Sequence, residues 1–100
     1  MSPKPKAEPH HVESVERILH SAGAQHLRAR KYGAAVIVES GPHDAPIKHL
    51  RVTRDTVHLW RLDFANHREK WETTPFRGEL KELLQTVIEN FGWTIAPFGE

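Results

Sequence analysis

The segment Ser40–Asp44 places a hydroxyl, an imidazole and a carboxylate within five residues. These groups are the parts of a catalytic triad, in which a carboxylate orients the histidine that deprotonates a nucleophile. Neighbours along a chain seldom have that geometry, and Gly41 and Pro42 are typical of a surface turn. We therefore predict no catalytic residue and a chain that is not an enzyme. A small enzyme that uses His43 and Asp44 is the second alternative.

Eight histidines and no cysteine limit any metal site to imidazole and carboxylate ligands. Zinc requires three or four converging ligands, and helical histidine ligands usually lie four residues apart or in an HExxH motif. The closest candidates have no such spacing: His10 with His11, His43 with His49, and His58. The glycines are isolated, so no phosphate-binding loop is expected. We predict no metal and no cofactor.

The charge of the chain is unevenly distributed. Residues 26–61 contain seven Lys and Arg residues against three acids, a net +4, and residues 62–100 contain four against seven, a net −3. A basic surface can neutralise the phosphates of a nucleic acid or meet the acidic surface of a second copy of the chain. The whole chain has a net charge of only +1, far below the strongly basic charge typical of nucleic-acid-binding domains.

We predict that basic residues of the middle segment share one face of a sheet and form a binding surface. They are Arg28, Arg30, His49, Arg51, His58 and Arg61. Residues two apart on a strand lie on the same face, which groups most of this set. A bulge near Leu59–Trp60 is needed to bring His58 and Arg61 together.

Two segments have the apolar period of an amphipathic helix, and they lie near opposite ends of the chain. Residues 78–93 form the longer helix, with one apolar stripe made of Leu80, Leu83, Leu84, Val87, Ile88 and Phe91. A left-handed stop at Gly92 would give Trp93 a terminal hydrophobic contact. Residues 11–22 form a shorter helix that ends at Gly23.

Between these helices the sequence predicts an antiparallel sheet of four or five strands. Residues 25–32 and 35–39 form either a hairpin around Lys31–Gly33 or one long strand bent at Gly33. A helix that continues through Arg30 is a further alternative. A loop over residues 40–46 then follows, because this segment is rich in Gly, Pro and Asp.

The remaining strands are expected at residues 47–53, 56–64 and 69–73. Their alternation predicts that Val52 lies opposite Val57, Leu50 opposite Leu59, Phe64 opposite Glu69, Asp63 opposite Lys70 and Arg61 opposite Glu72. Apolar pairs and opposite charges across two strands stabilise such a register.

One conflict remains, because Leu59 and Trp60 are consecutive although each continues an alternating apolar series. Either both faces of the sheet are covered, or a bulge at this point exchanges the faces. Two helices are few for covering both faces, which favours the bulge. Trp71 would then join Leu62 in the core.

These elements predict a single α+β domain over residues 10–100, preceded by a disordered tail over residues 1–9. The N-terminal helix leads into the sheet, and the C-terminal helix packs on one face of it. No apolar run approaches the roughly 18–20 residues that span a bilayer, so we expect no membrane contact. The chain has no cysteine and its first ten residues lack the apolar region of a secretory signal, so we expect a cytoplasmic location.

The predicted function is a small non-enzymatic binding or interaction module. It acts through the sheet face or edge that the C-terminal helix leaves uncovered, and its partner is another protein or a second copy in a homodimer. The first alternative is a nucleic-acid-binding module that uses the basic sheet surface.

Overall fold

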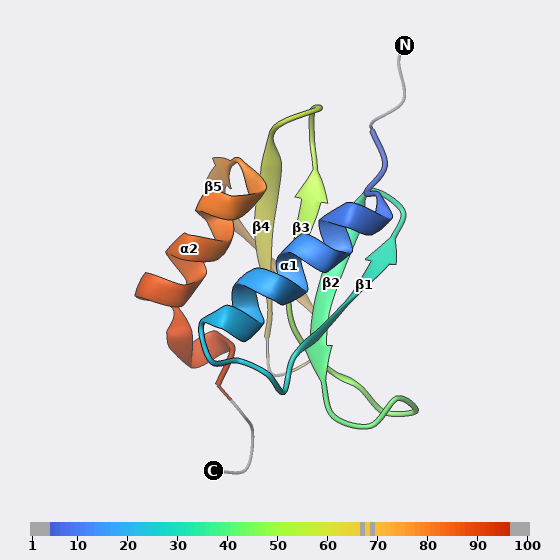
Figure 1. Ribbon diagram of the computed structural model, residues 1–100, viewed down its shortest axis with the longest axis vertical. Helices are drawn as coiled ribbons and strands as arrows, with labels where there is room; N and C mark the ends of the chain where they lie inside the picture. Colours follow the sequence, from blue (N-terminus) through green and yellow to red (C-terminus); the bar gives the residue numbers. More distant parts are fainter. Residues whose placement is uncertain (1–4, 67, 69, 97–100) are drawn as a thin grey trace.

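A helix from each end of the chain packs on the same face of a five-stranded antiparallel sheet (Figure 1). This computed structural model describes residues 5–66, 68 and 70–96. Its elements are α1 (Pro9–Ser21), β1 (Arg28–Tyr32), β2 (Ala35–Ser40), β3 (Ile47–Arg54), β4 (Trp60–Ala65), β5 (Trp71–Gly78), α2 (Leu80–Asn90) and the 3₁₀ helix η1 (Gly92–Thr94). The predicted α+β class, antiparallel sheet and terminal helices are confirmed.

The strands follow one another across the sheet in the order β1-β2-β3-β4-β5. Consecutive antiparallel strands need only short turns between them, which makes this the simplest way to connect them. The helix α1 contacts β1 and β2, whereas α2 contacts β4 and β5, and the two helices touch each other (Figure 1). Together they cover one side of the sheet.

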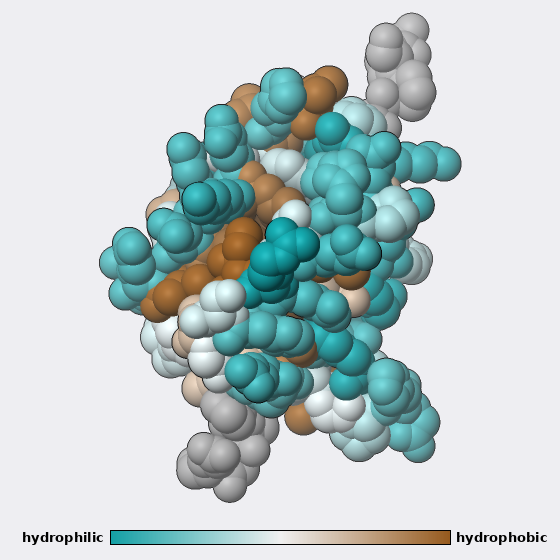
Figure 2. All heavy atoms as spheres, in the orientation of Figure 1, coloured by the Kyte–Doolittle hydropathy of each residue, from teal (hydrophilic) through white to brown (hydrophobic). Residues whose placement is uncertain are grey.

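The core is an apolar layer between the sheet and the helices. The strands contribute Val36, Val38, Leu50, Val52, Trp60 and Leu62, and the helices contribute Val15, Leu19, Leu83, Leu84 and Val87. Each of these side chains is at most 3% exposed. The predicted stripe of the C-terminal helix is confirmed, since Leu80, Ile88 and Phe91 also pack against this layer. Figure 2 shows apolar atoms in the seam between the helices, framed by hydrophilic side chains.

The strands β1 and β2 form the hairpin predicted around Lys31–Gly33, so the bent strand and the longer helix are wrong for this segment. Gly33 has a φ of 59°, a left-handed conformation that glycine adopts without steric cost. Of the N-terminal stretch 1–9, residues 1–4 lie outside the described residues. Ala7 is buried, and its N–H donates to the carbonyl of Gly33 at 3.1 Å. The chain before α1 is thereby tied to the β1–β2 turn.

The predicted register between the third and fourth strands is wrong. Residues 55–59 form a loop, and β4 begins only at Trp60. Val52 therefore lies opposite Leu62 rather than Val57. A two-residue turn at Arg54–Asp55 was expected because Val57 and its neighbours alternate like a strand, but the chain uses those residues to close a longer loop.

The conflict between Leu59 and Trp60 is resolved without the predicted bulge. Leu59 belongs to the loop and is 45% exposed, whereas Trp60 is 3% exposed and starts the apolar face of β4. Leu62 and Phe64 continue that face toward α2. The irregularities lie elsewhere, in the β2–β3 ladder after Val38 and in the β4–β5 ladder.

The predicted pairing of the last two strands is also wrong. Phe64 lies opposite Glu72 instead of Glu69, and Arg61 lies opposite Arg77 instead of Glu72. The strand β5 continues through Pro75, beyond residue 73, where this strand was predicted to end. Proline is tolerated there because β5 is an edge strand with an irregular register at this point.

The end of α2 differs from the prediction. The helix ends at Asn90, and Gly92 begins the 3₁₀ helix instead of forming a left-handed stop. Among the described glycines, only Gly23, Gly33 and Gly41 have positive φ. Trp93 is 77% exposed, so the predicted terminal hydrophobic contact does not form.

Two leucines on either side of the β4 start test the observed register. Leu62→Ala should lower the free energy of unfolding by roughly 2–5 kcal/mol, because its fully buried side chain leaves a cavity. Leu59→Ala should change the free energy of unfolding by less than about 0.5 kcal/mol, because the side chain lies in an exposed loop. Urea denaturation followed by circular dichroism measures both. Equal losses of unfolding free energy in the two variants would support the register predicted from the sequence.

Candidate binding surface on the uncovered sheet face

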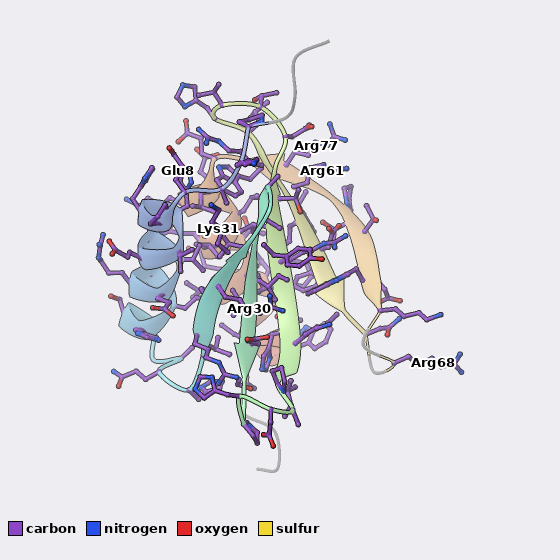
Figure 3. The ribbon with its side chains drawn as sticks, turned by 90° about the vertical axis from the view of Figure 1, so that its right-hand side faces the viewer. Glu8, Arg30, Lys31, Arg61, Arg68 and Arg77 are labelled. Atoms are coloured by element: carbon purple, nitrogen blue, oxygen red, sulfur yellow. The ribbon has the colours of Figure 1, made fainter. Side chains whose placement is uncertain are left out.

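The sheet face that turns away from both helices is lined with charged and aromatic side chains. Directly opposed residues of antiparallel strands share a face, so the register assigns each side chain to one side. The charged and aromatic members of this open face are Arg28, Arg30, Tyr32, Glu39, Lys48, Arg51, Arg61, Asp63, Trp71 and Arg77. Six cations against two carboxylates give it a net charge of +4. Figure 3 shows Arg61 and Arg77 on the side of the molecule away from α1.

The two carboxylates of the open face are buried beneath the arginines. Glu39 is 5% exposed and Asp63 is 6% exposed. The Nε of Arg30 donates to Glu39 at 3.1 Å, with Arg28 a further 3.7 Å contact, and the Nε of Arg51 donates to Asp63 at 2.8 Å. A buried carboxylate needs such partners, since an unpaired buried charge is strongly destabilising. The acids therefore orient the arginines while the cations remain at the surface.

Aromatic rings lie at both margins of the open face. Tyr32 on β1 is 69% exposed, and the guanidinium of Arg30 lies 5.9 Å from its ring centroid. Trp71 lies opposite Ala65 on this face, so its predicted place in the core beside Leu62 is wrong. The guanidinium of Arg51 lies 4.8 Å from the Trp71 ring centroid, within the range of a cation–π contact.

Arg61 and Arg77 are directly opposite each other on β4 and β5 (Figure 3). Like charges in this position destabilise a sheet. The side chain of Arg77 is 63% exposed and lies 3.5 Å from Asp55. In the part of the chain that the structure describes, Arg61 has no ion pair, and its Nε is buried without a hydrogen-bond partner. Among the described residues, Arg61 is thus the arginine of the open face that lacks a carboxylate partner.

Of the six predicted binding residues, the structure brings four onto this face: Arg28, Arg30, Arg51 and Arg61. His58 lies in the exposed loop between β3 and β4. His49 lies where β3 has an extra residue relative to β2, and it is only 3% exposed. Neither histidine is part of the open face.

His49 has a structural role at the end of the sheet. Its Nδ1 donates to the carbonyl of Thr94 at 2.8 Å, and its Nε2 accepts the hydroxyl of Ser40 at 2.7 Å. His26 makes a parallel contact of 2.7 Å with the carbonyl of Ile95. Burial lowers the pKa of His49 and nearby His26 lowers it further, whereas the Thr94 carbonyl opposes this shift. The neutral ring thus fastens the segment after α2 to the sheet.

The segment Ser40–Asp44 does not form a triad. His43 and Asp44 are exposed on the β2–β3 loop, and neither lines a described hollow of the surface. The hydroxyl of Ser40 is bound to His49 instead, and Ser40 is 7% exposed, too enclosed for a substrate to reach.

A second cluster of titratable groups lies where α1 begins. Ligand atoms of Glu8, His10 and His11 all lie within 4.8 Å of one another, an arrangement that a metal ion could use. The Nδ1 of His11 already accepts the N–H of Glu8, and Arg54 contacts the Glu8 carboxylate at 3.7 Å. The cluster therefore works as a helix cap, with a cation already beside its only acid.

Sequence reasoning missed several residues of the open face: Tyr32, Lys48, Trp71 and Arg77. Tyr32 lies two residues after Arg30, so its position was available from the period of two. Lys48 lies three residues before Arg51, and only the extra residue at His49 brings it to this face. Trp71 and Arg77 depended on the β4–β5 register, which charge pairing predicted wrongly.

Comparison with protein-family models, with curated proteins and with solved structures finds no match for this chain. Within the described residues, no helix has both the length and the apolar character needed to cross a membrane.

Stability should depend on pH through His49. The pKa of His49 is lowered in the folded state. The stabilisation of the fold by its neutral ring is therefore complete above the unfolded pKa of about 6.5, and it is lost as the pH falls below that value. The lowered pKa of His11 acts in the same direction. The free energy of unfolding should therefore fall between pH 7.5 and 5, and His49→Gln should reduce that fall while costing about 1–3 kcal/mol at pH 7.5.

Urea titrations at several pH values measure this effect, and His43→Gln in the exposed loop is the matched control. The control should reproduce the pH dependence of the wild type. An unchanged pH dependence in His49→Gln would show that this histidine does not couple protonation to folding.

Proposed function

We propose that this chain is a non-enzymatic binding module that holds an acidic segment of a partner protein on its open sheet face. The observation that carries the proposal is the net charge of +4 on a sheet face that neither helix covers. Electrostatic complementarity of this kind increases association rates and selects partners of opposite charge. As expected from the sequence, we place the module in the cytoplasm.

The arginines keep donors available for a partner. Arg30 and Arg51 use Nε for their buried carboxylates, and their terminal amino groups make no hydrogen bond within the described residues. Planar guanidinium groups match carboxylates through paired hydrogen bonds. Their aliphatic stems cover Ile37, which lies opposite both arginines and is only 5% exposed. The open face thus presents hydrogen-bond donors of Arg30 and Arg51, whose side chains are held in place by buried carboxylates.

The sheet edges are less suited to a partner strand than the face. At the β1 edge, the N–H of Ala29 already donates to Glu16 of α1 at 2.8 Å. The other edge strand, β5, contains Pro75 and an irregular register. Proline, irregular pairing and cover by another element all protect edges from strand addition. A homodimer with two open faces in contact is disfavoured too, because it would bring two surfaces of +4 together.

Nucleic-acid binding is the second candidate function. It is favoured by the exposed ring of Tyr32 and by the stacked pair of Arg51 and Trp71. Aromatic rings and arginines on a basic surface bind single strands by stacking on bases and neutralising phosphates. The two buried carboxylates and the modest net charge of the chain favour the acidic protein segment instead.

Fluorescence anisotropy with a labelled oligoglutamate peptide tests the proposal, and a single-stranded oligonucleotide of equal charge tests the second candidate. Lys48→Gln/Arg77→Gln should weaken peptide binding by about tenfold, because two charges of the open face are lost. The affinity of the wild type should fall as salt rises.

The matched control is Arg17→Gln/Lys81→Gln, which removes two exposed cations from the helices. It should change the affinity by less than about twofold, because those charges lie away from the open face. Equal weakening by both variants would refute the face as the binding surface. Tighter binding of the oligonucleotide than of the peptide would favour nucleic-acid binding as the function.

A further inference from the structure

We infer that Arg61 and Arg77 form a phosphate site, so that the acidic partner segment carries a phosphorylated side chain. This inference rests on the proposed function and names the group that the open face selects. Phosphorylated segments are commonly recognised by clusters of arginines, because guanidinium groups bind phosphate oxygens in pairs.

The two arginines are placed where both can bind one anion. They are directly opposed on β4 and β5, and such side chains have Cβ atoms about 4.5–5.5 Å apart. Like charges opposed in this way destabilise a sheet, and an anion bound by both side chains would relieve the repulsion. A phosphate monoester carries a charge of about −1.5 to −2 at neutral pH, which matches two cations better than one carboxylate does.

Arg61 differs from the other arginines of the open face. The other four arginines of the open face each have a carboxylate within 4.0 Å: Arg28, Arg30, Arg51 and Arg77. Within residues 5–66, 68 and 70–96, Arg61 has none, and its buried Nε lacks a hydrogen-bond partner. Buried donors without partners are rare in native proteins and usually mark a strain, a function or an unseen ligand.

A third residue completes the site. Thr53 on β3 lies directly opposite Arg61 on its other side, so one row across the sheet presents a hydroxyl and two guanidinium groups. Hydroxyl and arginine donors together are suited to the three terminal oxygens of a phosphate. Asp55, in the loop between β3 and β4, is held by Arg77, 3.5 Å from its Nη1.

The test uses three labelled peptides of one acidic sequence, which carry phosphoserine, serine or glutamate at the central position. The wild type should bind the phosphoserine peptide about tenfold more tightly than the glutamate peptide. Arg61→Lys keeps the charge and loses the paired geometry, so this preference should fall to about twofold. The affinity of Arg61→Lys for the serine peptide should differ from that of the wild type by less than about twofold.

Arg30→Lys is the matched control, because that arginine lies on the same face and is bound to Glu39. It should retain the preference for phosphoserine. Arg77→Lys, an exposed position that folding tolerates, should lose the preference as Arg61→Lys does. Equal binding of the three peptides to the wild type would overturn the phosphate site and leave the proposed function standing. Failure to bind any of the three peptides would overturn both.

Discussion

The structure depends on one apolar layer, because the chain has only two helices with which to cover its sheet. Both helices pack on the same side, and side chains such as Val38, Leu62 and Leu84 become fully buried there. Burial of apolar area is the main driving force of folding, so the sheet must direct its apolar series toward the helices. Alternation along the strands then sends the intervening side chains to the other side.

The properties of the open face follow from this constraint. A face without cover cannot be broadly apolar, and here arginine stems cover the little apolar surface that remains, such as Ile37. Glu39 and Asp63 hold these stems in place from below. A mixed but basic surface is the result, with ordered guanidinium groups and one uncompensated arginine. The same alternation that builds the core thus builds the surface that we assign to binding.

Local patterns predicted the fold well, whereas contacts distant in sequence were predicted poorly. The stripe of α2 and the β1–β2 hairpin were correct because both are determined within a short segment. The β3–β4 register was wrong because residues 55–59 alternate like a strand but form a loop. For the site, the period of two placed Arg28, Arg30 and Arg51 correctly, whereas Arg61 was assigned to this face through a bulge that does not form. His49 was misplaced because one extra residue in β3 moves it to the covered side, a feature that no local pattern marks.

The most direct test of the open face is a nuclear magnetic resonance titration of ¹⁵N-labelled protein with the acidic peptide. The strands and the side-chain Nε–H groups of Arg30, Arg51 and Arg77 report on the open face, whereas α1 and α2 report on the covered side. If the open face binds the peptide, shifts occur on the strands and these side chains, with little change along the helices. Shifts concentrated on α1 and α2, with the strands unaffected, would refute binding at the open face.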